Sequence, residues 1–140
     1  MHEKLLILVL KGFGIICCLA VVPLLMPTSW MAACHEWLGM GDFPKMPVAE
    51  YLARMTSGLC AFLGVLALLL ASDIRRYAGA IRLLAISIGL LEVINLLYGL
   101  PSGMPAWWLW IDAVGAGGFA IAVIYLQQKI ASGSSTSELE

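Results

Sequence analysis

Residues 77–100 read YAGAIRLLAISIGLLEVINLLYGL, and this stretch decides the fold. A helix that crosses the hydrocarbon core of a bilayer needs roughly 20 mostly apolar residues, which this stretch supplies. A transmembrane barrel strand would instead alternate apolar and polar residues over about ten positions, and the run IGLLEVINLL at 88–97 does not alternate. Because backbone polar groups in lipid must be satisfied within their own segment, the pattern predicts a membrane-spanning helix.

Three more stretches have the same character, so the sequence predicts four spans. Their approximate bounds are 5–26, 50–71, 77–100 and 107–128. The whole chain of 140 residues is 61% hydrophobic and 12% charged, whereas a soluble domain is about 45–50% apolar and about 25% charged. The composition therefore excludes a soluble globule and a disordered chain. A net charge of −1 leaves the chain without the broad basic surface that meets the phosphates of a nucleic acid, and so excludes a nucleic-acid partner.

The fold class that follows is an all-α membrane protein with four transmembrane helices in an antiparallel up-down bundle. Short connections, such as the one at 101–106, favour antiparallel neighbours. Residues 1–131 are expected to form a single transmembrane domain. The remainder, 132–140, is polar and rich in Ser, which predicts a disordered tail. Its last two residues, Leu139 and Glu140, are typical of a cloning remnant.

The orientation of the bundle follows from the basic residues near the span ends. These residues are Lys4, Arg75, Arg76 and Lys129. Cytoplasmic loops carry an excess of Lys and Arg, so both termini are expected in the cytoplasm and the lipid bilayer is the first partner. Lys11 and Arg82 lie in the inner half of their spans and are expected to extend toward the cytoplasmic head groups.

The first outer loop contains the segment TSWMAACHEWLGMGDF at 28–43, in which apolar residues recur at helical spacing. This pattern predicts a short amphipathic helix lying on the outer membrane surface. Thr28 or Ser29 is the expected N-cap, and Gly39 or Gly41 the expected end. Two roles stay open for this helix: a lid over the bundle or a connector along the membrane surface.

Three ionisable side chains inside the spans form the main functional hypothesis. Arg54, Glu92 and Asp112 lie on different spans, yet their positions put each about 7–9 Å to the outer side of the membrane midplane, at ~1.5 Å of rise per residue. An ionisable residue in a span is costly unless it is paired or in contact with water. A common depth therefore predicts an outward-facing polar pocket. The residues expected to line it are Arg54, Glu92, Asn95, Asp112, Tyr98 and His35.

Besides an Arg54 side chain that extends toward the outer head groups, two structural alternatives stay open for the same side chains. Arg54 could pair with Glu92 or Asp112 only to neutralise charge and fix helix register. It could also pair with Glu50 along its own helix, at i,i+4 spacing.

Signatures of catalysis and of cofactors do not occur in the sequence. The four cysteines make no C-x-x-C pair, and the two histidines, His2 and His35, lie outside the spans. No Ser-His-Asp order, glycine-rich phosphate loop or H-E-x-x-H is present. The expectation is no metal, no cofactor and no catalytic residue. The glycines at 115, 117 and 118 lie in an apolar helix and are expected to pack against neighbours.

The stretch EYLARMTSGLCAFLGVLALLLASDIRRYAGAIRLL at 50–84, followed by LLYGLPSGMPAWW at 96–108, resembles the DoxX-like group of small four-helix bacterial membrane proteins. The shared features are an arginine near the start of the second span, glycines within it, a short basic loop, and a Gly/Pro element after the third span. The resemblance implies the architecture and a bacterial inner membrane. It carries over no catalytic residue.

The function expected from these observations is non-catalytic. The chain would bind a lipid, a quinone or another small amphiphile in the outward pocket, or serve as a subunit of a larger membrane assembly, as a homodimer or with a partner membrane subunit. One alternative is a small proton-coupled transporter that works as a dimer, with Glu92 as the proton site. Another is a membrane enzyme that uses Glu92 or Asp112 as acid or base.

Overall fold

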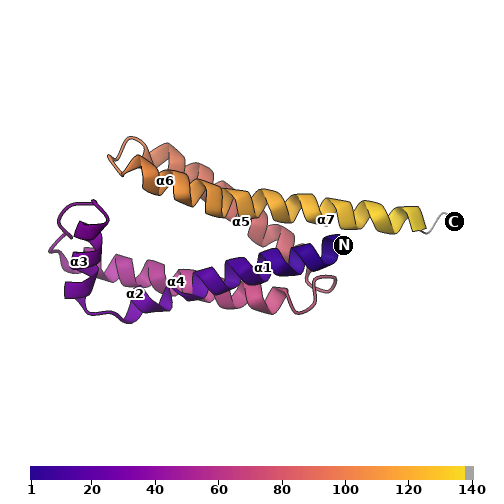
Figure 1. Cartoon of the computed structure of the whole chain (residues 1–140), viewed down its shortest axis with the longest axis horizontal. Helices are drawn as coiled ribbons and strands as arrows, with labels where there is room; N and C mark the ends of the chain where they lie inside the picture. Colours follow the sequence, from indigo (N-terminus) through magenta and orange to yellow (C-terminus); the bar gives the residue numbers. More distant parts are fainter. Residues whose placement is uncertain (138–140) are drawn as a thin grey trace. The chain divides into compact units, whose positions relative to one another are not determined.

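The computed structural model describes residues 1–137, and in that range every regular element is a helix. The elements are α1 (His2–Cys18), α2 (Val21–Leu25), α3 (Thr28–Trp37), α4 (Pro47–Leu70), α5 (Ala78–Gly99), α6 (Ala106–Asp112), the π-helix η1 (Ala113–Gly117) and α7 (Gly118–Ser137) (Figure 1). The chain is thus all-helical over the part that the structure describes.

Four helical segments are long and apolar enough to cross a membrane. They are His2–Leu25, Pro47–Leu70, Ala78–Gly99 and Ala106–Gly133. The prediction of four spans is confirmed, and the observed bounds lie within a few residues of the predicted ones. The up-down packing of these spans as one bundle and the placement of α3 on a membrane surface stay predictions.

The first span is interrupted by a tight turn between α1 and α2. Pro23 has no N–H, and its ring clashes with the carbonyl four residues earlier, so it disfavours a continuous α-helix through this point. At this point backbone hydrogen bonds join residues three apart instead of four. They run from Ala20 N to Cys17 O at 3.1 Å and from Val22 N to Leu19 O at 3.0 Å. The last turn, α2, then ends at Leu25, just before Pro27.

The segment at 28–43 does contain a helix, but its start differs from the prediction. The N-cap residue of α3 is Pro27, and no side chain caps the helix. Thr28 is already inside the helix, and its hydroxyl donates to Glu50 Oε1 at 2.7 Å instead of to the backbone. The Thr28 hydroxyl, which the local sequence predicts to cap the helix, therefore hydrogen-bonds instead to Glu50, a residue distant in the sequence. Gly39 and Gly41 follow the helix with φ values of 75° and 80°.

The fourth span contains a π-helical turn that the sequence did not suggest. α6 ends at Asp112, η1 covers Ala113–Gly117, and α7 then resumes the ordinary α-helix. π-helical turns are rare and frequently lie at functional sites. The turn is glycine-rich, but a Cβ added at Gly115 would meet no atom within 4 Å, and the same holds at Gly118, just beyond it. Within the described residues, these two glycines therefore do not lie at a close contact between helices.

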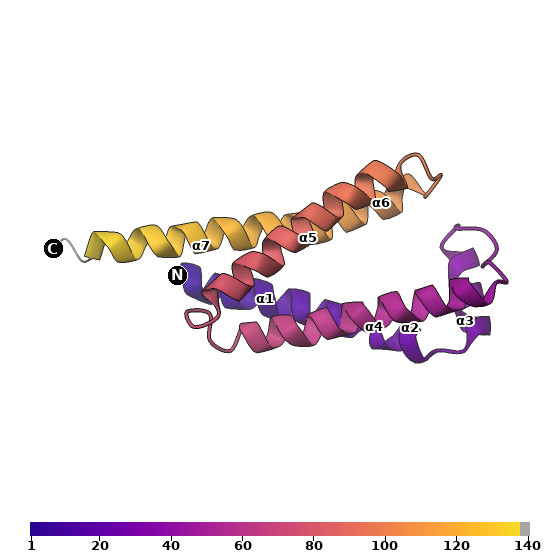
Figure 2. The same ribbon diagram turned by 180° about the vertical axis from the view of Figure 1, so that it is seen from behind.

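The helices form two compact units. Unit 1 comprises Met1–Phe13 together with the chain from Ala67 onward, and unit 2 comprises Gly14–Leu66. In unit 1, α5 packs alongside α6, η1 and α7 (Figure 2). Its core contains four side chains that are essentially inaccessible, namely Leu6, Leu10, Ile81 and Val123. The rings of Phe13 and Phe119 stack there with their centroids 3.9 Å apart.

In unit 2, the end of α1 approaches α4 very closely at Gly64. A Cβ on Gly64 would lie 2.7 Å from Cys18 N and 2.7 Å from Gly14 O, which is closer than real Cβ atoms come. Only glycine fits here, because backbone meets backbone. Close approach at small residues is a common way to pack membrane helices.

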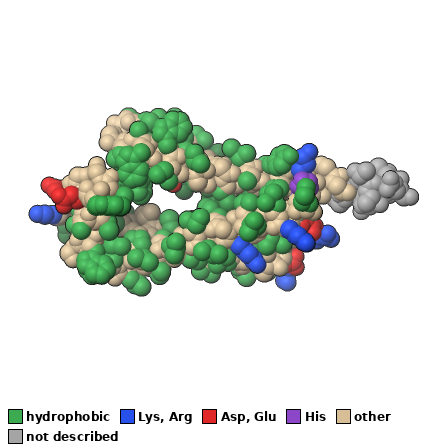
Figure 3. Space-filling view, viewed as in Figure 1, with side chains coloured by type: hydrophobic (Ala, Val, Ile, Leu, Met, Phe, Trp, Pro, Cys, Tyr) green, Lys and Arg blue, Asp and Glu red, His purple; other side chains and the backbone are tan. Residues whose placement is uncertain are grey.

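Large apolar side chains cover much of the visible surface, as a lipid-facing surface requires (Figure 3). On α5 and α7, for example, Leu90 is 62% and Ile121 is 72% exposed. Lys and Arg gather near the N-terminal end of α1 in the same view. The predicted disordered tail differs in extent, because α7 continues to Ser137. Leu139 and Glu140 lie outside the described residues.

Candidate functional site

Among the residues that the structure describes, the most unusual polar side chain is Glu92, in the C-terminal half of α5. It is only 5% exposed. Within residues 1–137, its Oε1 atom is fully buried and has no hydrogen-bond partner. A buried polar atom without a partner costs roughly 1–3 kcal/mol relative to a satisfied one. Such an atom in a membrane span marks a place where a ligand, a proton or water would be stabilised.

Two other polar residues from unit 1 accompany Glu92. Asp112, the residue just before η1, lies close enough for the two carboxyl groups to interact electrostatically. Asn95, one turn further along α5, also interacts with the Glu92 carboxyl group. On the facing wall stands Gly117, where an added Cβ would lie 3.7 Å from Glu92 Cγ. The π-helical turn thus presents a glycine to the buried carboxylic side chain.

The two acidic residues of this group, Glu92 and Asp112, give it a negative character. Neither Glu92 nor Asp112 is in an ion pair among the residues that the structure describes. Two neighbouring carboxylates in membrane spans repel each other, and for Glu92, which is buried whereas Asp112 is exposed, burial adds to the cost of a charge. The arrangement therefore favours a cation, a proton or a hydrogen-bond donor at this point.

Arg54 lies in unit 2, where it binds three partners. Its guanidinium contacts Glu50 Oε1 through Nη2 at 2.9 Å and through Nε at 3.1 Å. Its Nη1 donates to Leu24 O at 2.8 Å, and its Nη2 lies 3.4 Å from Thr28 Oγ1. The i,i+4 pair with Glu50, one of the two structural alternatives, is therefore present.

The contact with Leu24 has a simple physical cause. The last carbonyls of a helix have no partner within the helix, and α2 ends at Leu25. Arg54 supplies the donor that the interrupted span lacks. The sequence analysis did not predict Leu24 and Thr28 as partners of Arg54. The proline at position 27 was nevertheless a signal, because it indicates where a helix ends and its last carbonyl groups lack partners. Beside Arg54 lies a small, mostly apolar recess of about 240 Å³, lined also by Tyr51, Met55 and Leu59.

The other predicted site residues lie in different surroundings. Tyr98, near the end of α5, is 73% exposed. His35 belongs to unit 2, where its Nδ1 lies 2.9 Å from Gly41 O and its ring meets Phe43 edge-on at 5.5 Å. Unit 1 thus brings together Glu92, Asn95 and Asp112. The convergence of Arg54 with Glu92 and Asp112 stays a prediction.

The role of Arg54 leads to a stability prediction. Arg54→Met is expected to lower the free energy of unfolding by about 1–3 kcal/mol, because Leu24 O loses its donor. Thermal unfolding of the purified protein in detergent, followed by tryptophan fluorescence, measures the effect. Arg76→Met is the matched control, since that exposed guanidinium only covers the ring of Tyr77. Equal midpoints for the two variants would contradict the assigned role.

The described residues were also compared with what a metal site requires. Within residues 1–137, no group of three or more His, Cys, Asp or Glu side chains is placed to hold a metal ion.

The chain stands apart in comparisons with known proteins. No protein-family model, no curated protein and no solved structure matches it. The resemblance of residues 50–108 to the DoxX-like group therefore stays a prediction from sequence.

Proposed function

We propose that this chain is a non-catalytic multi-pass membrane protein that binds a small amphiphile at Glu92 and Asp112. The observation that carries the proposal is the Oε1 atom of Glu92, which is buried within a candidate span and has no hydrogen-bond partner among residues 1–137. A protein that used Glu92 only for structure would satisfy this atom with one of its own donors. An unsatisfied acceptor is better explained by a partner that comes from outside the chain.

The surroundings of Glu92 indicate the chemistry of the ligand. Two acidic side chains favour a polar head that is positively charged or donates hydrogen bonds. Apolar side chains of α5 next to Glu92 are open to the surroundings, with Leu91 54% and Val93 54% exposed. Ile111, beside Asp112, is 65% exposed. A ligand with a donor head and an apolar tail matches both features.

A comparison of three ten-carbon amphiphiles tests the proposal. We expect decylamine to raise the thermal unfolding midpoint of the purified protein more than decanol does, and decanoate to leave the midpoint unchanged. Glu92→Gln and Asp112→Asn are each expected to weaken decylamine binding about tenfold, because each removes a charge-assisted hydrogen bond, at about 1.4 kcal/mol per tenfold.

The control for these variants is an acidic residue away from the spans. Glu36→Gln changes an exposed carboxylate of α3 and is expected to leave decylamine binding unchanged. If decanoate shifts the midpoint as strongly as decylamine, or if Glu36→Gln weakens binding as much as Glu92→Gln, the assignment to this site fails.

Proton-coupled transport is the second candidate function. Neighbouring carboxyl groups within spans are typical of proton pathways, and the π-helical turn beside Glu92 offers an element that can rearrange. In proteoliposomes, this function predicts uptake or efflux of a cationic probe that follows a pH gradient and stops in Glu92→Gln. Binding of decylamine without any gradient-driven flux would support binding alone.

The membrane setting completes the proposal. Four apolar helices support a membrane protein. A bacterial inner membrane with both termini in the cytoplasm is proposed from the basic residues at Lys4, Arg75 and Lys129. The exposed apolar surface also fits a second copy of the chain or a partner membrane subunit.

A further inference from the structure

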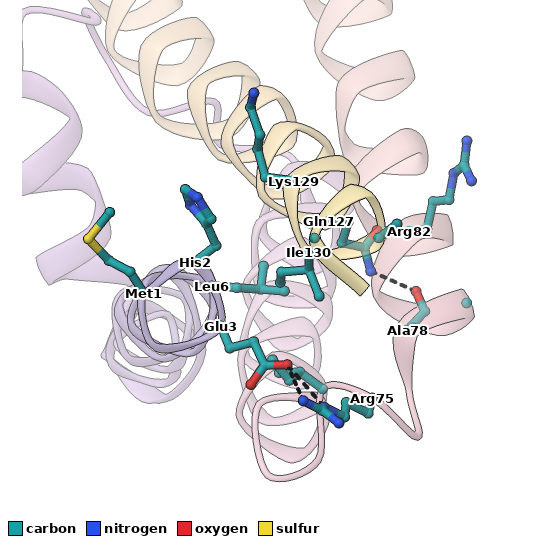
Figure 4. Close-up of a pocket in the computed structure, with 14 residues that line it drawn as sticks. Met1, His2, Glu3, Leu6, Arg75, Ala78, Arg82, Gln127, Lys129 and Ile130 are labelled. Carbon is teal, nitrogen blue, oxygen red and sulfur yellow. Dashed lines mark hydrogen bonds and ion pairs between the residues drawn. The ribbon is translucent and has the colours of Figure 1, made fainter. Parts of the chain in front are cut away.

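A second polar region of unit 1 lies where α1 and α5 begin and α7 approaches its end. A cavity of about 870 Å³ opens there between these helices. Figure 4 shows side chains from all three helices around it, together with Arg75 from the loop before α5. One wall is held by Gln127 of α7, whose Nε2 donates to Ala78 O at 2.8 Å. The volume is within the range of roughly 300–1,000 Å³ typical of small-molecule sites.

The charged side chains of this cavity are mainly basic. Arg75, Arg82 and Lys129 line it, and Glu3 is the acidic residue among the lining residues. Glu3 is already paired, because its Oε1 accepts from Arg75 Nη2 at 2.9 Å and from Arg75 Nε at 3.0 Å. Figure 4 shows this pair on one side of the view, with the side chains of Lys129 and Arg82 extending away from it in different directions.

Arg82 and Lys129 therefore supply positive charge that no acidic side chain of the described residues pairs with. Neither is in an ion pair within the described range 1–137. Lys129 Nζ lies 5.7 Å from the centre of the Tyr125 ring, which leaves its hydrogen-bond donors available. Both side chains are long and exposed, so both can turn toward an anion that enters the cavity.

Apart from His2 and Gln127, the rest of the lining is mostly apolar, and the cavity lies at the end of the candidate spans. Leu6, Ile74 and Ile130 contribute apolar surface. The third candidate span begins at Ala78 and the fourth ends at Gly133, which puts the cavity at the level of lipid head groups. Basic pockets between membrane helices at this level typically hold anionic lipid head groups.

We propose that this cavity binds the phosphate group of an anionic phospholipid, with Arg82 and Lys129 as the cationic ligands. The apolar side chains would contact the first part of an acyl chain. The site differs from the acidic one at Glu92 in charge sign and in place. Arg82 and Glu92 are ten residues apart on α5, which is about 15 Å along the helix.

The first experiment compares lipids. The full chain, in an uncharged detergent, is titrated with dioctanoylphosphatidylglycerol, with dioctanoylphosphatidylcholine and with inorganic phosphate, and the thermal unfolding midpoint is measured. We expect phosphatidylglycerol alone to raise the midpoint. An equal shift with phosphatidylcholine would overturn the proposal. An equal shift with inorganic phosphate would assign the free anion as the ligand and overturn the lipid assignment.

Charge variants locate the binding site. The double variant Arg82→Gln/Lys129→Gln is expected to weaken phosphatidylglycerol binding about thirtyfold, from about 1 kcal/mol per basic residue near a membrane surface. The matched control, Lys4→Gln/Arg76→Gln, removes the same charge from the same end of unit 1 but from residues that do not line the cavity. An equal loss in both double variants would show general attraction to the surface and reject the cavity.

Two further variants test the geometry without removing a basic residue. Glu3→Gln frees Arg75 from its ion pair and is expected to tighten binding about fivefold. Gly79→Leu places a side chain in open space at the cavity, since a Cβ there meets nothing within 4 Å, and is expected to weaken binding. Unchanged binding in both would overturn the proposal, and Glu92→Gln should leave phosphatidylglycerol binding intact even if the acidic site binds no amphiphile.

Discussion

Gly64→Ala is expected to lower the free energy of unfolding by about 1–3 kcal/mol, the cost typical of forcing an extra methyl group into a tightly packed contact. The new Cβ would lie 2.7 Å from both Cys18 N and Gly14 O. These are backbone atoms of a neighbouring helix and cannot turn aside as a flexible side chain would. The helices must therefore move apart along their line of contact, and the surrounding side chains lose packing.

Gly58→Ala on the same helix separates this effect from helix propensity. At Gly58 the nearest atom to an added Cβ is Leu24 Cδ1, at an ordinary 3.7 Å. Alanine is favoured over glycine within a helix by roughly 0.5–1 kcal/mol at either position. We therefore expect Gly58→Ala to be neutral or stabilising in thermal unfolding. A Gly64→Ala protein as stable as Gly58→Ala would show that the two helix backbones are not in contact at this point.

Glu92→Met is expected to act in the opposite direction and raise the free energy of unfolding by about 1–3 kcal/mol. Methionine keeps an unbranched side chain of similar volume while removing the buried acceptor that has no partner in the described chain. It also removes the repulsion from Asp112. The measurement is the unfolding midpoint in detergent without added amphiphile.

Glu36→Met is the control. That carboxylate is exposed, so its removal is expected to leave the free energy of unfolding unchanged. If Glu92→Met destabilises the protein, the carboxyl group contributes to folding and the structural explanation for this residue prevails. If it stabilises the protein and abolishes decylamine binding, Glu92 is retained for its ligand at a cost to stability. Such a trade-off is common at functional sites.

The two polar regions of unit 1 together suggest how amphiphiles of opposite charge would be sorted along one helix. Glu92 lies in the C-terminal half of α5, and Arg82 lies near the beginning of the helix, beside the basic cavity. A donor-bearing head group fits the first, and a phosphate fits the second. Because the two sites respond to different variants, their ligands can be assigned independently.

The amino-acid sequence determined by itself that this is a four-span helical membrane protein. Length and hydropathy are local properties, and in lipid they leave a segment such as 77–100 with hardly any alternative to a helix. The sequence also identified Glu92 and Asp112 as costly, and the i,i+4 spacing already contained the Glu50–Arg54 pair. What each side chain meets across helices was decided by tertiary structure.

The examples share one physical reason. Thr28 has the chemistry of an N-cap but donates to Glu50, because a partner twenty-two residues away offers a stronger, charged acceptor. Gly64, and not Gly115 or Gly118, is a glycine at which two helix backbones meet, since contact depends on the rotation of each helix about its axis. The π-helical turn packs against α5, and the basic cavity is lined by residues of α1, α5 and α7 that are far apart in the sequence. Composition and spacing specify which residues are available, whereas packing between helices determines which of them meet.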